Sequence, residues 1–132
     1  MDTNLAAFAW GRACVTARPS AAAGAGAASP RIAPHFHLPL QHGSDKMLRA
    51  MRRPYQVADY VRLVEGLHRS LPHASIGSDI IVGFPGETDG EFRDMCHVLE
   101  ELPLTHLHVF PYSDRPGTAA SGRFPKVDGA AI

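Results

Sequence analysis

Cysteine is scarce in this sequence, and the placing of the two cysteines excludes several kinds of site. Cys14 and Cys96 lie far apart in a chain of 132 residues. They form no CxxC pair and no zinc quartet, and they supply no disulfide framework. Two unlinked thiols are typical of a reducing compartment, so we expect a cytoplasmic protein.

Long apolar runs and an excess of one charge are also missing. No run reaches the ~18 apolar residues that a membrane span needs. The first residues are mildly apolar, but they include Asp2 and are interrupted by Arg12, which is unlike a signal peptide. Lysine and arginine together number 13, as do aspartate and glutamate, so net charge favours no class of partner. We expect neither a membrane nor DNA as a partner.

Composition divides the chain into three parts. The stretch RPSAAAGAGAASPR has too few large apolar side chains to offset the entropy of ordering. We therefore predict a disordered, low-complexity segment over 1–33. A folded region over 34–121 and an irregular tail over 122–132 are expected to follow it.

Hydrophobic periodicity and turn residues predict alternating strands and helices in the middle part. A capping box at Thr88 and Glu91 marks the start of one helix, and Pro54 is expected to end another. Such alternation is typical of parallel strands joined by helices, an α/β class. The predicted strands cover 35–40, 74–82 and 107–112, and the predicted helices begin near residues 44, 56 and 88.

Three polar loops rich in glycine or proline follow the three predicted strands, in the order QHGSD, GFPGET and YSDRPGT. Ligands of α/β proteins lie beyond the carboxyl ends of the strands, so these loops are candidates for one shared site. Gly83 would allow a ligand to approach the backbone closely. Glu87 either binds a ligand or interacts favourably with the dipole at the N-terminus of the next helix. Asp79 either faces a ligand or ion or lies at the wet start of its strand.

Three longer segments together resemble the radical SAM methylthiotransferases. They are PHFHLPLQHGSDKMLRAMRRPY, SDIIVGFPGETDGEF and LHVFPYSDRPGTAAS, in the order and spacing of that family. The resemblance covers about Arg31 to Ser121. The motifs HVFPYS and RPGT make the sequence most similar to the enzymes that methylthiolate threonylcarbamoyladenosine in tRNA.

The resemblance implies a fold, a reaction and a set of site residues. The fold would be part of a radical SAM (β/α) partial TIM barrel, roughly its strands four to six, with helices outside. The enzyme would add a methylthio group to a modified adenosine of tRNA, using S-adenosylmethionine (SAM) and [4Fe–4S] clusters. The implied cofactor-binding residues are Gln41, Ser44, Asp79, Gly83, Glu87, Phe110 and Tyr112.

The sequence also departs from this family. The CxxxCxxC motif that holds the radical cluster is absent, and two cysteines cannot supply the six thiolates that the family's two clusters need. His42 stands where the family usually has serine, beside the expected cofactor. We therefore expect this chain to be an inactive fragment on its own, with no catalytic or metal-binding residue assigned.

Two other functions compete with the resemblance. His35 and His37, like His106 and His108, are spaced so that both side chains of a strand share one face, which is a common metal arrangement in barrel hydrolases. A non-enzymatic RNA-binding role is the other alternative, because basic residues recur along one predicted helical surface. These basic residues are Lys46, Arg49, Arg52, Arg53 and Arg62.

Overall fold

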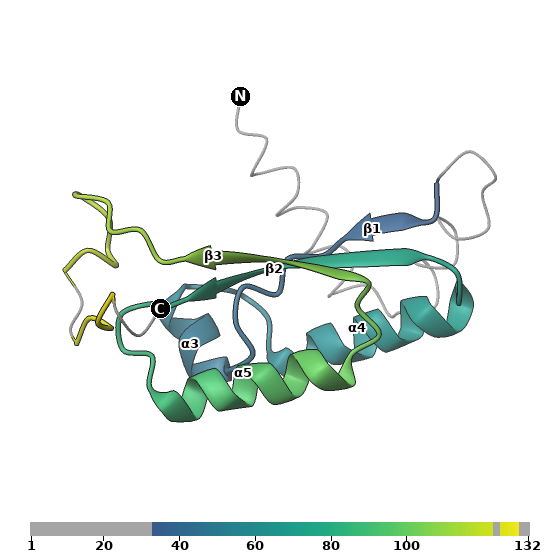
Figure 1. The fold of residues 1–132 in the computed structure, drawn as a ribbon, viewed down its shortest axis with the longest axis horizontal. Helices are drawn as coiled ribbons and strands as arrows, with labels where there is room; N and C mark the ends of the chain where they lie inside the picture. Colours follow the sequence, from purple (N-terminus) through teal and green to yellow (C-terminus); the bar gives the residue numbers. More distant parts are fainter. Residues whose placement is uncertain (1–32, 123–124, 130–132) are drawn as a thin grey trace.

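The computed structural model describes residues 33–122 and 125–129. The predicted disorder of 1–33 falls almost entirely outside these residues, as does part of the predicted tail. Six elements follow one another along the described chain (Figure 1). They are β1 (His35–His37), α3 (Asp45–Ala50), α4 (Val57–Ser70), β2 (Ser75–Val82), α5 (Asp89–Glu101) and β3 (His106–Pro111).

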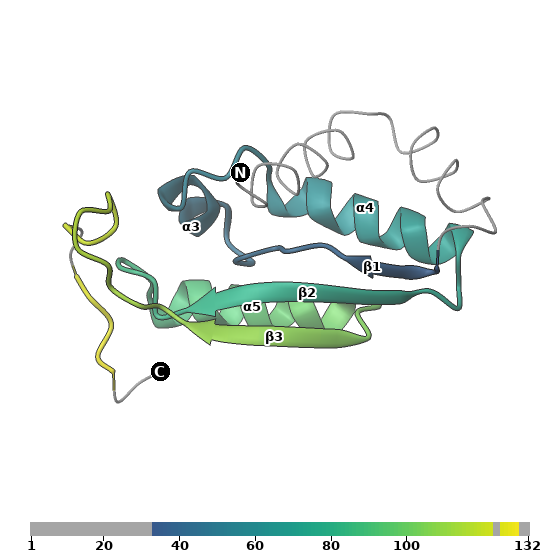
Figure 2. The same cartoon turned by 90° about the horizontal axis from the view of Figure 1, so that it is seen from above.

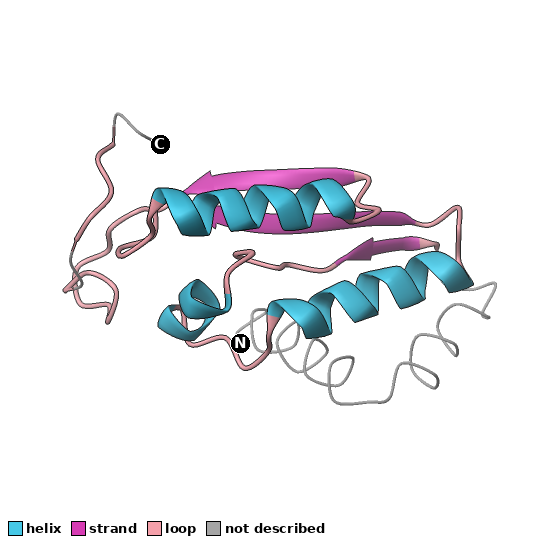
Figure 3. Cartoon of the chain, turned by 90° about the horizontal axis from the view of Figure 1, so that it is seen from below, coloured by secondary structure: helices cyan, strands magenta, loops and turns pink. Residues whose placement is uncertain are grey.

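The three strands form one parallel sheet in the order β1–β2–β3. Helix α4 leads from the first strand to the second, and α5 leads from the second to the third. The helices lie together on one face of the sheet, as Figures 2 and 3 show from opposite sides. Among the described elements nothing covers the other face, which we call the open face. The predicted α/β class with parallel strands is confirmed.

The hydrophobic core lies between the sheet and the two long helices. Ile76 and Ile80 of β2 point into it and are 0% and 4% exposed. The predicted apolar stripe of α4 is buried against them, with Val64 fully covered. Burial of these side chains on one face leaves the alternate residues of β2, including Asp79, on the open face.

The first strand is shorter than the predicted 35–40 because its backbone pairing is interrupted. Pro39 has no N–H to donate, and the N–H of Leu40 donates to the buried hydroxyl of Ser78 at 3.1 Å instead of to a backbone carbonyl. Pairing resumes at Gln41, whose N–H donates to the Asp79 carbonyl at 2.8 Å. The strand therefore continues toward its loop after a break, with a side chain replacing one ladder bond.

Helix ends follow the predicted signals at α5 and differ at α3. Thr88 caps α5, and the capping box with Glu91 is present. Helix α3 ends at Ala50, well before the expected stop at Pro54, because Arg52 adopts the left-handed conformation with φ 57°. Within the ranges described, no helix is both long and apolar enough to cross a membrane.

Candidate functional site

The loops after the three strands meet at one edge of the sheet. Gln41 forms a parallel bridge with Ile80, and Gly83 directly follows the end of β2. Phe110 lies beside Ile81 in the register of β2 with β3. Gln41, Gly83 and Phe110 are therefore neighbours at the carboxyl ends of adjacent parallel strands, as the sequence predicts. Ligand binding by these residues stays a prediction.

Gln41 holds an unusual backbone conformation at this edge. Its φ of 72° lies in the left-handed region, which costs a residue with a Cβ on the order of 1 kcal/mol. Its carbonyl accepts a hydrogen bond from the N–H of Ile81 at 2.8 Å, so pairing with β2 holds the conformation in place. Strained residues of this kind are concentrated at ligand-binding sites.

Two tyrosines fix the segment that leads to Gln41. The hydroxyl of Tyr60 donates to the Leu38 carbonyl at 2.6 Å, and that of Tyr55 donates to the Leu40 carbonyl at 3.0 Å. Burial raises the pKa of Tyr60 to about 12 and also raises the pKa of Tyr55. Both phenols thus stay protonated donors, and they hold the loop from the helix side.

Glu87 is turned inward and shapes the loop after β2. Its Oε2 accepts hydrogen bonds from the N–H groups of Gly83 at 2.9 Å and Phe84 at 3.2 Å. The side chain is 6% exposed. Gly83 and Gly86 have φ of 75° and 90°, which explains glycine at both positions. This geometry favours a role for Glu87 in holding the loop, and its predicted contact with a cofactor is untested.

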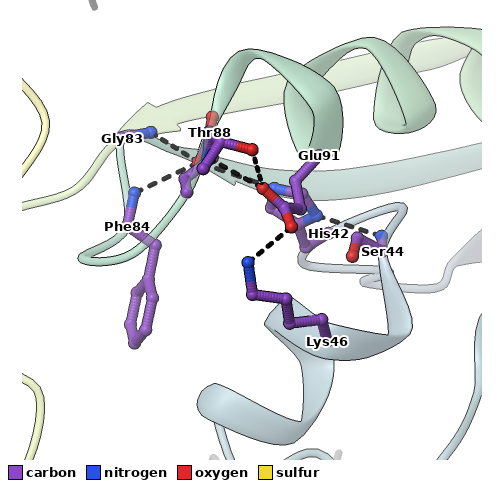
Figure 4. A network of polar contacts seen from close by, with 8 residues as sticks. His42, Ser44, Lys46, Gly83, Phe84, Thr88 and Glu91 are labelled. Carbon is purple, nitrogen blue, oxygen red and sulfur yellow. Dashed lines mark hydrogen bonds and ion pairs between the residues drawn. The ribbon is translucent and has the colours of Figure 1, made fainter.

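His42 lies behind the edge and not beside an open site, which corrects the expected placement. The imidazole is 0% exposed. Its Nδ1 accepts the N–H of Ser44 at 3.0 Å, so the ring proton is on Nε2, which points at Oε2 of Glu87 from 3.5 Å. Figure 4 shows His42 among these groups. A ring buried in this way braces the two loops against each other and cannot obstruct a ligand sterically.

Ser44 takes part through its backbone N–H, and a surface ion pair lies in the same region. The residue caps α3 without a hydrogen bond from its side chain. Lys46 of α3 reaches across to Glu91 of α5, with 2.6 Å between Nζ and Oε1 (Figure 4). The lysine and the capping-box hydroxyl together lower the pKa of Glu91 to about 2. The loops after the first and second strands are therefore tied at the surface as well as in the interior.

The two predicted aromatic residues of the third loop have different surroundings. Phe110 is 49% exposed on the open face. Tyr112 packs edge to face against Phe84, with 5.3 Å between ring centroids. Of these two rings, Phe110 is the more exposed and is suited to stack on a flat ligand such as a nucleobase.

A shallow hollow lies near this edge of the sheet. Its volume of ≈ 190 Å³ is below the roughly 300 Å³ at which small-molecule pockets begin. This hollow is therefore too small to enclose a typical small-molecule ligand. The lining residues are Ala50, Met51, Arg52, Arg53, Ile81, Phe84, Ala119 and Ala120.

Asp79 lies in the middle of β2, which corrects the alternative that it begins its strand at a wet rim. Its Oδ1 is 3.0 Å from Nε2 of His37 and 3.2 Å from Nδ1 of His108. The predicted sharing of one face by each histidine pair is confirmed by the stacked and tilted rings of all four imidazoles. The partnership with Asp79 was missed, because strand register is needed to see it.

The basic surface that suggested RNA binding is partly neutralised. Lys46 pairs with Glu91, and Arg62 pairs with Asp59 three residues before it. Arg53 is half-buried at the hollow, so fewer cations are both exposed and unpaired than the sequence suggests. The observation weakens the RNA-binding alternative.

Comparison with known proteins matches residues 23–99 to the Radical SAM superfamily. The chain belongs to this superfamily. A tRNA-2-methylthio-N(6)-dimethylallyladenosine synthase of Thermobifida fusca is 47% identical over 95 residues, 72% of this chain and 19% of the relative. The threonylcarbamoyladenosine tRNA methylthiotransferase of Aquifex aeolicus is 45% identical over 97 residues, 74% of this chain and 24% of the relative.

These relatives confirm the resemblance to the methylthiotransferases. A dimethylallyladenosine synthase of Mycobacterium leprae is 45% identical over 76% of this chain and 20% of its own length. The chain thus spans about a fifth of the length of the curated relatives that it matches. Relatives of both adenosine subgroups match at similar identity, so the similarity does not separate them.

The superfamily implies an iron–sulfur cluster and SAM, and the residues present fit the two groups differently. Cluster irons are held by cysteine thiolates, and this sequence has only Cys14 and the half-buried Cys96 of α5. That donor set does not fit a [4Fe–4S] cluster. The strand ends do fit one side of a nucleoside, because Gly83 has no side chain and Phe110 exposes its ring.

Proposed function

We propose that this chain supplies the nucleoside-facing strand ends of a radical SAM tRNA methylthiotransferase. The single observation that carries the proposal is the convergence of Gln41, Gly83 and Phe110 at one edge of a parallel sheet. In the relatives named above, the matching segments belong to enzymes that modify an adenosine of tRNA. The thiolates for the cluster must then come from outside the residues of this chain.

Each residue at this edge has a proposed role in holding SAM. Phe110 offers an exposed ring on which the adenine can stack. The bare Cα of Gly83 lets the ribose approach the strand end closely. Gln41 offers its side-chain amide there, because its backbone N–H and carbonyl are both paired with β2. Asp79, Ser44, Glu87 and Tyr112 complete the predicted set, with Glu87 acting through the loop that it holds.

SAM supplies a radical once its sulfonium is reduced. The residues of this chain bind and orient the nucleoside and hold the loops in place. Positioning of this kind is what separates a productive from an unproductive geometry, and a misplacement of about 1 Å costs roughly 100-fold in rate. The interior contact of His42 with Glu87 and the surface pair of Lys46 with Glu91 serve that positioning.

The proposed substrate is a modified adenosine in tRNA. The motifs HVFPYS and RPGT favour threonylcarbamoyladenosine as the substrate, whereas the Thermobifida relative is named for dimethylallyladenosine. Arg49 and Arg52 are exposed near the same edge and are suited to phosphate contacts. The proposed compartment is the cytoplasm.

A hybrid enzyme tests the proposal. Residues 31–121 of this chain replace the matching segment of the Thermobifida relative, and 5′-deoxyadenosine and methylthiolated tRNA nucleosides are measured by mass spectrometry. We expect the hybrid to cleave SAM, and Phe110→Ala to weaken SAM binding by about tenfold, since stacking on a base is worth about 1–3 kcal/mol.

The matched control is Val109→Ala, because Val109 is the adjacent residue and is similarly exposed, at 56%. Side chains of neighbouring strand residues point to opposite faces, so this change should leave SAM affinity within about twofold. A folded, cluster-loaded hybrid that fails to bind SAM would refute the proposal. Equal losses from both variants would refute the role of Phe110.

A further inference from the structure

Four imidazoles and one carboxylate form a cluster on the open face, away from the strand-end loops. The imidazoles of His35 and His106 stack with 5.6 Å between centroids, and those of His37 and His108 are 5.5 Å apart. Asp79 lies between His37 and His108 on the middle strand. Three separate strands thus each contribute a potential ligand to one place.

Three atoms of this cluster converge as the ligands of a metal ion do. They are Nε2 of His37, Oδ1 of Asp79 and Nδ1 of His108, and all lie within 4.8 Å of one another. Oδ1 is 3.0 Å and 3.2 Å from the two nitrogens. Bonds of about 2.0–2.2 Å to zinc would place neighbouring tetrahedral ligands about 3.3–3.6 Å apart. Oδ1 is within a few tenths of an ångström of that spacing from each nitrogen, and the two nitrogens, which lie within 4.8 Å of each other, would approach by up to about 1 Å.

We propose that His37, Asp79 and His108 bind one divalent first-row transition-metal ion on the open face of the sheet. Two imidazoles and one carboxylate form a donor set that such ions favour, and three protein ligands leave coordination positions for water or a substrate group. The ligand side chains are 38%, 24% and 56% exposed, so an ion can enter from solvent.

His106 packs beside the three ligands without being one of them. Nδ1 of His106 contacts the hydroxyl of Thr105 at 3.1 Å, and its ring lies over Gly77. A Cβ on Gly77 would be 2.0 Å from Nε2 of His106, so glycine makes room for this ring. The ring of His106 lies beside those of both His37 and His108 and limits their movement.

The proposal does not rest on the proposed function or on an iron–sulfur cluster. The ligands come from β1, β2 and β3 themselves, whereas the proposed SAM-facing residues Gln41, Gly83 and Phe110 lie farther along, at the strand ends. Asp79 belongs to both sets, and the register places it two residues before Ile81, the neighbour of Phe110. Metal bound to Asp79 would take this one side chain from the SAM-facing set and leave Gln41, Gly83 and Phe110 free.

The test uses the whole 132-residue chain without an affinity tag, carrying Cys14→Ser and Cys96→Ser so that thiols add no ligand. Isothermal titration with Zn²⁺ measures stoichiometry and affinity, and Co²⁺ absorption reports the coordination geometry. We expect one ion per chain. His37→Ala, Asp79→Asn and His108→Ala should each weaken binding more than about 100-fold, which exceeds the loss seen for outer-shell residues.

His35→Ala is the matched control, because His35 is on the same strand and face as His37 but outside the three ligands. Its effect on zinc affinity should stay below about threefold. Equal losses in His35→Ala and His37→Ala, or zinc affinity that survives all three ligand changes, would overturn the site.

Circular dichroism on the same samples keeps the test decisive if the metal-free chain is poorly folded. The three ligands meet only when the strands pair, so Zn²⁺ must then increase the helical signal and raise the melting temperature. This gain should disappear in Asp79→Asn and persist in His35→Ala. No gain in the parent chain, together with no binding, would refute the proposal.

Discussion

Gly43 lies directly against the backbone of Met95 in helix α5. A Cβ built on Gly43 would be 2.5 Å from the Met95 Cα, closer than packed atoms approach. The loop after the first strand therefore rests on the second crossover helix only because position 43 has no side chain. This contact fixes where the loop, and with it Gln41, lies relative to α5.

Gly43→Ala should lower the free energy of unfolding by about 1–3 kcal/mol, because the clash is with backbone and neither segment can yield cheaply. Gly66→Ala is the control, since nothing lies within 4 Å of a Cβ at that position of α4. It should raise stability by about 0.5–1 kcal/mol through helix propensity. Urea unfolding of both variants measures the difference, and effects of the same sign would contradict the contact.

Glu91 should make stability depend on pH in the acid range. Lys46 and Thr88 lower its pKa from an ordinary 4.5 to about 2 in the folded chain. The folded state thus favours the ionised form, and the stabilisation is complete above about pH 4.5 and is lost as pH falls through about 2.

Glu91→Gln measures this contribution, because glutamine keeps a capping-box side chain but has no charge. The two chains should differ by at most about 1 kcal/mol at pH 7, as expected for a surface ion pair. The difference should shrink toward zero between pH 4.5 and pH 2. A difference that does not change over this range would show that the charge contributes nothing.

Glu87→Ala should destabilise the loop after β2. The change leaves the N–H groups of Gly83 and Phe84 without their acceptor and removes the carboxylate that lies 3.5 Å from the buried Nε2 of His42. A buried unsatisfied group costs about 1–3 kcal/mol. Glu100→Ala, at an exposed position of α5, is the control and should stay within about 0.5 kcal/mol. Thermal unfolding compares the two, and similar midpoints would contradict the inward role of Glu87.

The purified chain should form no [4Fe–4S] cluster. Cys14 and Cys96 are its only thiols, fewer than the three thiolates that a CxxxCxxC motif supplies to one cluster. Anaerobic reconstitution followed by iron and sulfide analysis measures the cluster, with the full-length Thermobifida relative as a positive control. About four irons and four sulfides per chain would refute the prediction.

The exposed edge of the sheet should cause self-association. Strand β3 is an edge strand, and Val109 and Phe110 are 56% and 49% exposed. Val109→Lys should reduce association by charge repulsion at that edge, whereas Glu100→Lys on α5 should not. Sedimentation velocity at increasing concentration measures the effect, and a concentration-independent monomer in the parent chain would contradict it.

The sequence predicts the elements well where one local signal is enough, as with the capping box at Thr88 and Glu91. It fails where a distant partner decides the outcome. The break at Pro39 is stabilised by Ser78, a residue 38 positions away from the Leu40 N–H that it accepts. No local pattern predicts that bond.

The candidate site divides in the same way. The ends of the strands and the positions of the glycines can be predicted from the sequence, and Gln41 and Gly83 do lie at the predicted edge of the sheet. The inward turn of Glu87 depends on loop amides that only the folded chain brings within reach. The contact of Asp79 with His108 depends on a strand register that the sequence does not specify.

The left-handed backbone of Gln41 has a stereochemical consequence. A φ of 72° is strained for an L-residue but natural for its mirror image, so a chain assembled by chemical ligation with D-glutamine at this position would keep the amide and relieve the strain. We expect that chain to be more stable by about 1 kcal/mol. Inverting the chirality of this one Cα would thus show whether the protein requires the left-handed backbone conformation at position 41 or the glutamine side chain.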